Sequence, residues 1–224
     1  MKSKQLLAIL ALSFTLFFIP LIGISAIDFA KLSNFALQQY GPEAKKTLMD
    51  LSQLIATLRL ADEQTKVKKI NDFINANITF FVPDIEIWGE KDYWATPLEA
   101  LGRKSGDCED YSIAKYLLLK ELNIPNKQLK ITYVRAQIAN EGGNEVLAHM
   151  VLSYYPQNSS EPLILDNLTP DILTASNRPD LTPIYSFNSE GLWVGNSTQQ
   201  KGNATSHLSR WRDLLIRIKN DGFN

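Results

Sequence analysis

The sequence predicts an α+β fold, in which several helices come first and then pack on an antiparallel β-sheet. Apolar residues recur at helical spacing through the first half of the chain. Later segments are β in character and are separated by short polar turns, as in antiparallel strands. With 224 residues the chain can build one domain with a proper core and hardly two. We therefore expect a single domain over residues 27–224.

The N-terminal segment, residues 1–26, has the pattern of an export signal. Two lysines precede an apolar run over residues 6–24, and small residues follow it as far as Ala26. The run lies between the apolar core of a cleaved signal peptide, about 7 to 15 residues, and a membrane anchor of about 20. The small residues favour a cleaved signal peptide, and an uncleaved segment would tether the protein to a membrane.

Composition excludes some classes of protein. Hydrophobic residues make up 45% of the chain and charged residues 21%, as in ordinary globular proteins and unlike disordered or fibrous chains. A formal net charge of -1 provides no positive field to attract a polyphosphate. Nucleic acid is therefore not an expected partner.

Helices are expected wherever apolar residues recur every three or four positions. The first three cover residues 29–40, 43–60 and 62–76, and Gly41-Pro42 separates the first two. A short helix follows at 97–101 and a longer one at 107–122, which Asn123 and Pro125 end. The last helix is expected at 208–219.

Strands are expected over residues 129–138, 146–155 and 163–168, joined by polar turns at 140–144 and 156–162. They would form an antiparallel meander. Residues 78–95 are aromatic and irregular, which predicts a loop that either packs on the domain or lines a cleft. Residues 169–206 are expected to be extended loop with one edge strand at 192–194.

Cys108 is the first candidate for chemistry. It is the only cysteine, so no disulfide can form within the chain, and an exported lone thiol needs another explanation. The residue lies where the glycine-containing loop 102–106 becomes a helix, and a helix N-terminus favours thiolate over thiol. Cys108 is therefore either a nucleophile or a small buried hydrophobic residue.

A thiolate nucleophile needs a base, and the chain has two histidines. His149 lies in the second expected strand, and Asp166 in the next one could reach its imidazole and orient it. A hydrogen-bonded core histidine is the alternative for His149. His207 lies in a polar loop before the last helix, where a solvated or capping role is expected.

Four segments around these residues resemble the bacterial transglutaminase-like cysteine proteinases. They are WATPLEALGR at 94–103, GDCEDY at 106–111, AHMVL at 148–152 and LILDNL at 163–168, and the similarity covers roughly residues 71–168. The resemblance implies a papain- or transglutaminase-like fold with the nucleophile helix packed on the sheet, and a triad of Cys108, His149 and Asp166. It also implies a periplasmic endopeptidase that cleaves a large surface adhesin near its N-terminus, which releases the adhesin and promotes biofilm dispersal.

The same resemblance implies calcium dependence and a regulator. The matching carboxylates are Asp107, Glu109 and Asp110, which could supply part of the six to eight oxygen ligands that Ca²⁺ takes. Alternatively, Glu109 and Asp110 only complement the helix dipole. The implied regulator is an inner-membrane receptor for cyclic di-GMP that sequesters the protease. Zinc is not expected, because one cysteine and two histidines cannot build a site rich in sulfur and nitrogen.

Two other functions remain open from the sequence. The first is a transglutaminase or amidase of the same fold, because one acyl-thioester intermediate can be resolved by an amine or by water. The second, from a different class, is a non-catalytic module that uses the aromatic cleft only to bind another protein.

Overall fold

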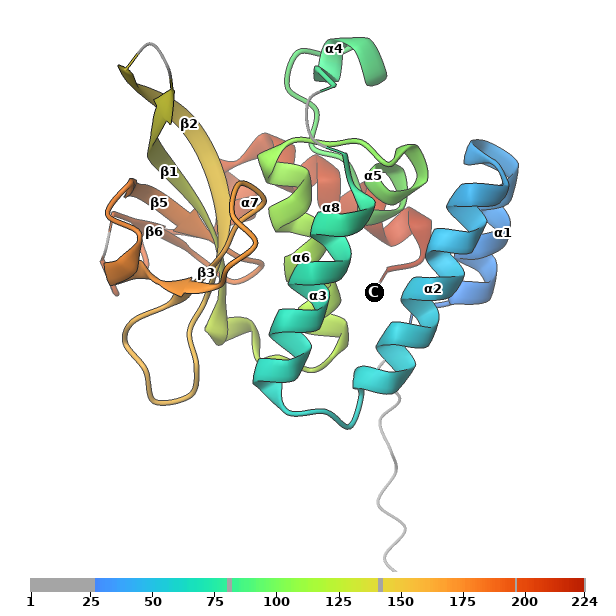
Figure 1. Ribbon diagram of the computed structural model, residues 1–224, viewed down its shortest axis with the longest axis horizontal. Coiled ribbons are helices and arrows are strands. Elements are labelled where there is room, and N and C mark those ends of the chain that lie inside the picture. Colours follow the sequence, from blue (N-terminus) through green and yellow to red (C-terminus); the bar gives the residue numbers. More distant parts are fainter. Residues whose placement is uncertain (1–26, 80–81, 141–142, 196, 224) are drawn as a thin grey trace, which may run out of the picture.

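A layer of helices packs against one antiparallel sheet, with six strands among the residues described (Figure 1). The computed structural model describes residues 27–79, 82–140, 143–195 and 197–223. The predicted export signal, residues 1–26, lies outside this part of the chain. Within the described residues, no helix has the length and apolar character needed to cross a bilayer. The predicted α+β class is confirmed.

The first three helices are α1 (Phe29–Tyr40), α2 (Pro42–Leu58) and α3 (Glu63–Asn77). Asp28 and Asp62 cap α1 and α3 by accepting hydrogen bonds from backbone N–H groups of the first turn. Gly41, with φ of 94°, lets the chain turn directly from α1 into α2. The predicted apolar stripes form the buried faces of these helices, including Leu48, Leu51, Ile55, Ile70 and Ile74.

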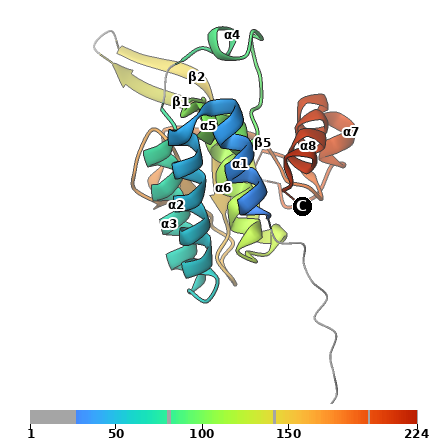
Figure 2. The same cartoon turned by 90° about the vertical axis from the view of Figure 1, so that its right-hand side faces the viewer.

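The helix that carries the cysteine, α6 (Cys108–Glu121), lies in the middle of the molecule. It contacts α3 and α5 (Pro97–Arg103) on one side and the sheet strand β2 (Gly143–Tyr154) on the other. Figure 2 shows α2 and α3 on one side of the molecule and the C-terminal helices on the other. Ile113, Tyr116 and Leu118 of α6 are all fully buried. Because it packs on several sides, α6 is fixed as a rigid support for its N-terminus.

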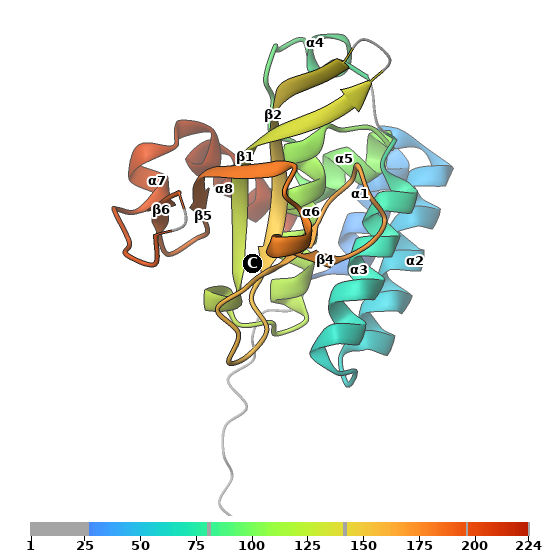
Figure 3. The same cartoon turned by 60° about the vertical axis from the view of Figure 1, so that its left-hand side comes forward.

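The sheet has the strand order β4-β3-β2-β1-β5-β6, with every neighbouring pair antiparallel. The three predicted strands are β1 (Leu129–Asn140), β2 (Gly143–Tyr154) and β3 (Leu163–Leu165). The β1–β2 pair extends beyond the rest of the sheet as a twisted ribbon (Figures 1 and 3). Residues 141–142 of the predicted turn lie outside the described residues. One face of the sheet packs on the helices and so contributes to the core.

The prediction that residues 169–206 are extended loop with one edge strand was wrong in part, because it missed two further strands. This stretch contains β4 (Leu173–Thr174), β5 (Leu181–Phe187) and the predicted edge strand β6 (Leu192–Val194). Strand β5 was missed because Pro183 interrupts its pattern, and proline argues against an inner strand. The structure accommodates Pro183 opposite Val134, next to an irregularity in the β1–β5 register and beyond the residues that pair with β6.

The remaining elements are short, except for the last helix. They are α4 (Asp84–Ile87) within the predicted aromatic loop, the 3-10 turns η1 (Asn126–Gln128) and η2 (Ala175–Asn177), α7 (Ala204–His207) and α8 (Ser209–Asp221). Trp211 of α8 is fully buried and meets the rings of Tyr116 and Phe187 edge-on. This packing docks α8, as predicted, beside α6 and the sheet.

Candidate active site

Cys108 is the first residue of α6, and Asp107 is its N-cap. The loop before Cys108 packs closely on Asp110. A Cβ atom at Gly106 would lie only 2.7 Å from Oδ2 of Asp110, so only glycine fits there. Asp110 is almost completely buried, and its carboxylate accepts hydrogen bonds from the N–H groups of Ala95 at 2.7 Å and Asp107 at 3.3 Å. The carboxylate of Asp110 therefore ties the aromatic loop to the start of the helix and fixes the cysteine.

His149 and Asp166 form a buried pair. Nε2 of His149 lies 2.8 Å from Oδ1 of Asp166, and the two residues are 5% and 1% exposed. His149 lies on β2, and Asp166 directly follows β3, just past the strand in which it was predicted. An ionised Asp166 accepts a hydrogen bond from the N–H at Nε2, which leaves Nδ1 as the ring nitrogen that can take a proton from a thiol.

Asp166 is also held by several other groups. Its Oδ1 accepts the N–H of Leu168 at 3.0 Å, and its Oδ2 accepts a hydrogen bond from Arg178 at 2.8 Å. Burial would raise the pKa of Asp166, but its hydrogen bonds with His149, Leu168 and Arg178 and the charge of the imidazole lower it to about 2. Asp166 is therefore a carboxylate at any physiological pH.

The backbone carbonyl of Asp166 has two partners of its own. Nζ of Lys115, on α6, donates to it at 3.0 Å, and Nδ2 of Asn75, on α3, donates at 2.9 Å. Lys115 is fully buried, and burial lowers its pKa to about 7, although the charge of Asp166 opposes the shift. The chain after β3 is thus fastened to the same helix that carries Cys108.

Cys108 and His149 line one cleft of about 490 Å³. Burial raises the pKa of the Cys108 thiol, and the backbone N–H of Met150, next to His149, has a smaller, opposite effect. Aromatic rings form part of the wall, among them the stacked pair Tyr133 and Tyr185, whose centroids are 5.1 Å apart. The other lining residues are Asp92, Trp94, Asp107, Glu109, Ala148 and Arg210. Asp92 and Trp94 come from the predicted aromatic loop, so that loop contributes to the cleft.

The thiol lies beside two carboxylates as well as at a helix N-terminus, and these groups have opposite effects on its pKa. Burial, followed by the negative charges of Glu109 and Asp107, raises the pKa of the Cys108 thiol. Sγ donates to Oε2 of Glu109 at 3.2 Å. The protein groups alone therefore do not lower the thiol pKa, because burial and two carboxylates oppose the effect of the helix N-terminus.

Three carboxylates meet beside the cysteine. Ligand oxygens of Asp84, Asp107 and Glu109 all lie within 4.8 Å of one another. Burial raises the pKa of Asp84, and burial together with the charge of Glu109 raises that of Asp107. One oxygen each of Asp84 and Asp107 is buried and has no hydrogen-bond partner among the described residues. A cation would satisfy both oxygens and offset the repulsion, and an all-oxygen donor set suits Ca²⁺.

This cluster differs by one residue from the predicted ligand set. Asp107 and Glu109 belong to it, whereas the carboxylate of Asp110 is engaged with two backbone N–H groups. Asp84, which was not predicted, reaches the cluster from α4. A lone acidic residue in an irregular loop carries no signal for this role. Arg178, the other unpredicted residue that contacts the site, also lies in irregular sequence, where a single charged residue gives no signal. His207 is exposed at the end of α7, as predicted.

Comparison with known proteins agrees with the geometry. The family model described as bacterial transglutaminase-like cysteine proteinase BTLCP matches residues 39–195. The structure of Legionella pneumophila LapG after EGTA treatment is 38% identical, with a TM-score of 0.72, and the match covers 87% of this chain and 99% of LapG. The calcium-bound form of that protein is also 38% identical, with a TM-score of 0.69 and coverage of 86% and 99%.

A comparison with curated protein sequences found no match. The family model nevertheless spans more than half of the chain, and both LapG structures share its helices and sheet over most of their length. The helix that begins at Cys108 and the antiparallel sheet on which it packs agree with the papain- or transglutaminase-like fold that the sequence predicts. The chain belongs to the bacterial transglutaminase-like cysteine proteinases.

Proposed function

We propose that this protein is a calcium-dependent periplasmic cysteine endopeptidase that uses Cys108, His149 and Asp166 as its catalytic triad. One observation carries the proposal. A buried imidazole is hydrogen-bonded at 2.8 Å to a buried carboxylate, and it shares a cleft with a cysteine at a helix N-terminus. Nucleophile, base and orienting residue are the three parts that thiol catalysis needs.

The proposed reaction proceeds in two steps. Nδ1 of His149 takes the proton from the Cys108 thiol while the sulfur attacks the peptide carbonyl carbon. The peptide C–N bond then breaks, the leaving amine takes the proton from the imidazolium, and a thioester remains on Cys108. In the second step water attacks the thioester, His149 accepts a proton from the water and returns it to the sulfur, and a carboxylic acid is released. Backbone N–H groups at the start of α6 would stabilise the oxyanion.

Asp84, Asp107 and Glu109 would hold the calcium ion. When bound, the ion would supply positive charge that offsets the carboxylates beside the Cys108 thiol. The residues themselves order the site, because Oδ2 of Asp84 accepts the N–H of Tyr93 at 2.7 Å and thereby holds the aromatic loop near the cleft. The similarity to LapG, which has been solved with calcium bound, supports this assignment.

The proposed substrate is the N-terminal region of a large surface adhesin, whose cleavage would release the adhesin and promote biofilm dispersal. The proposed inhibitory partner is an inner-membrane receptor for cyclic di-GMP. Both proposals rest on the family resemblance of the motifs, and export rests on residues 1–26.

The test is to incubate the purified protein with an N-terminal adhesin fragment in calcium or in EGTA and to identify products by mass spectrometry. Two fragments are expected in calcium and none in EGTA. Cys108→Ala and His149→Ala should abolish cleavage, while His207→Ala, at the other histidine, should not. A cross-linked product would favour transglutaminase activity instead. Equal processing by Cys108→Ala would leave only a binding role.

A further inference from the structure

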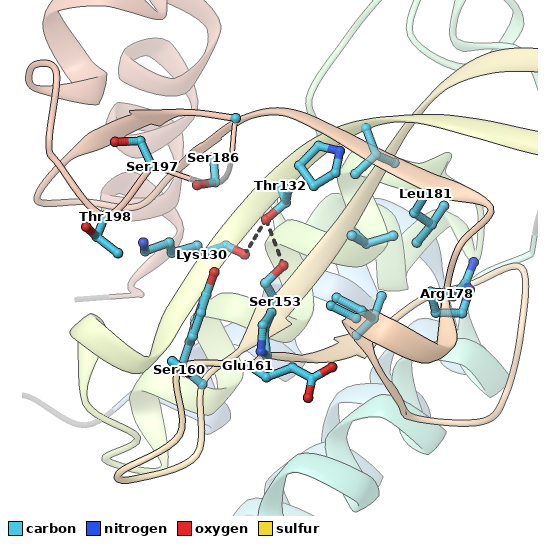
Figure 4. Close-up of a pocket in the computed structure, with 18 residues that line it drawn as sticks. Lys130, Thr132, Ser153, Ser160, Glu161, Arg178, Leu181, Ser186, Ser197 and Thr198 are labelled. Carbon is cyan, nitrogen blue, oxygen red and sulfur yellow. Dashed lines mark hydrogen bonds between the residues drawn. The ribbon is translucent and has the colours of Figure 1, made fainter.

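Arg178 lies on the opposite side of Asp166 from His149. It follows η2 and borders a cavity of about 320 Å³ on the face of the sheet that points away from the helices (Figure 4). Figure 4 shows its side chain at the end of this cavity near Leu181, away from Lys130. The residue is only 8% exposed. A buried guanidinium stays charged and needs partners, so its contacts define what it does.

Those contacts are two carboxylates. Nη2 donates to Oδ2 of Asp166 at 2.8 Å and to Oδ2 of Asp180 at 2.7 Å. Nε donates to Oδ1 and Oδ2 of Asp180 at 3.0 and 3.2 Å. Asp180 therefore clamps the guanidinium on one edge, and the clamped guanidinium presents one nitrogen to Asp166.

This arrangement leaves each oxygen of Asp166 with its own partner. Oδ1 binds His149 and the N–H of Leu168, while Oδ2 binds Arg178. Rotation of the carboxylate would break hydrogen bonds at both oxygens, and donors in fixed positions hold a planar acceptor in one orientation. Without Arg178, Oδ2 would be a buried oxygen with no charged partner, and the carboxylate could turn away from the imidazole.

We propose that Arg178 is a positioning residue, which orients Asp166 for its hydrogen bond to His149 while Asp180 holds the guanidinium in place. The inference rests on the proposed function, in which His149 is the base. Arg178 acts through Asp166, because it binds Oδ2 of the carboxylate while the imidazole binds Oδ1. A shift of about 1 Å in a supporting group can cost about 100-fold in rate.

The kinetic test compares Arg178→Gln, Arg178→Lys and Asp180→Asn with the wild type on the adhesin fragment. Arg178→Gln should lower kcat by about 10- to 100-fold with KM changed less than threefold, because the substrate cleft is not touched. Arg178→Lys keeps one charged donor and should recover part of kcat. Asp180→Asn keeps one oxygen that can accept a hydrogen bond from Arg178, so the guanidinium stays near Asp166 and the variant should cost less than fivefold.

A second measurement does not depend on activity. The ring N–H of a histidine bound to a buried carboxylate gives a downfield, slowly exchanging proton NMR signal, and only two histidines are present. Wild type and Asp180→Asn should show this signal for His149, and Asp166→Asn should lack it. In folded Arg178→Gln the signal should be lost or shifted upfield. His207→Gln confirms the assignment, since His207 is exposed.

The two readouts separate this inference from the proposed function. If wild type cleaves nothing, the proposed function fails, and the NMR signal still decides the role of Arg178. Retention of both kcat within twofold and the unshifted signal in Arg178→Gln would overturn the inference. A larger loss of kcat in Asp180→Asn than in Arg178→Gln would also overturn it, because the loop rather than the contact with Asp166 would then be what matters.

Discussion

His149 and Asp166 are joined by a 2.8 Å hydrogen bond in a part of the protein that water hardly reaches. His149 comes from the middle of β2, and Asp166 directly follows β3, which pairs with β2 only at Leu152, Ser153 and Tyr154. The imidazole therefore meets the carboxylate at the point where the two strands separate. This position lets His149 contact Asp166 on one side and face the cleft of Cys108 on the other.

Replacing Asp166 with asparagine should remove most of the activity while keeping the fold. The amide has nearly the same shape, but it cannot stabilise the imidazolium, and it can present an N–H to Nε2. We expect kcat to fall by about 10²- to 10⁴-fold, measured on the adhesin fragment at saturating calcium. Asp171→Asn alters an exposed carboxylate in the following loop and serves as the control. Unchanged kcat in Asp166→Asn would rule out the triad.

Asp166 should also make stability depend on pH in acid. Its folded pKa is about 2, below the ordinary unfolded value of about 4, so the folded state favours the ionised form. The resulting stabilisation, about 2 to 3 kcal/mol, is present above the unfolded value and is lost as pH falls from about 4 to about 2. In urea unfolding, the free energy of unfolding of the wild type should fall between pH 5 and pH 2 by about 2 to 3 kcal/mol more than that of Asp166→Asn. Parallel pH curves for the two proteins would contradict the assignment.

Calcium should stabilise the protein through Asp84 and its two neighbours in the cluster. At a concentration 100 times the Kd, a bound ion adds about 2.7 kcal/mol, which raises the Tm by several degrees. Asp84→Asn should weaken calcium binding at least about tenfold, because it removes a charged ligand. Isothermal titration calorimetry and thermal unfolding with and without EGTA measure both effects.

Asp92→Asn is the matched control for this prediction. Asp92 also lines the cleft, but its carboxylate pairs with Arg210 at 2.9 Å and does not belong to the cluster. The variant should therefore keep the calcium response. An Asp84→Asn protein that binds calcium as tightly as wild type would remove Asp84 from the ligand set and would restore Asp110 as the third candidate.

Gly106 should tolerate no side chain. In Gly106→Ala the new Cβ would lie 2.7 Å from Oδ2 of Asp110, which is buried and cannot move aside. The free energy of unfolding should fall by about 1 to 3 kcal/mol, and the displaced loop should lower kcat as well. Chemical denaturation and steady-state kinetics check the two effects.

A substitution two residues earlier should act in the opposite direction. Lys104 ends α5 in the left-handed region, with φ of 54°. Lys104→Gly should leave stability unchanged or raise it by up to about 1 kcal/mol. If both variants were equally destabilised, general sensitivity of the loop, rather than the contact with Asp110, would be the cause.

The sequence alone was enough for the longer helices, the central strands and the three candidate catalytic residues, but not for the short helices α4 and α7. These predictions rest on local signals, such as the apolar period of α2 and α3, the glycine-containing loop before Cys108, and polar turns between strands. Each signal depends on residues close together in the chain, because the period of a helix or strand is set by backbone geometry. The family resemblance joined Cys108, His149 and Asp166, which composition and spacing could only suggest.

Only the tertiary structure decided which groups surround those three residues. Asp84 joins Asp107 and Glu109 because α4 folds over the start of α6, and Arg178 meets Asp166 because the chain after β3 turns back to the sheet. Strand β5 exists because β1 offers it a partner in spite of Pro183. The physical reason is common to all three. Burial, charge pairing and strand pairing depend on residues brought together from distant segments, and no local pattern in the chain encodes which ones will meet.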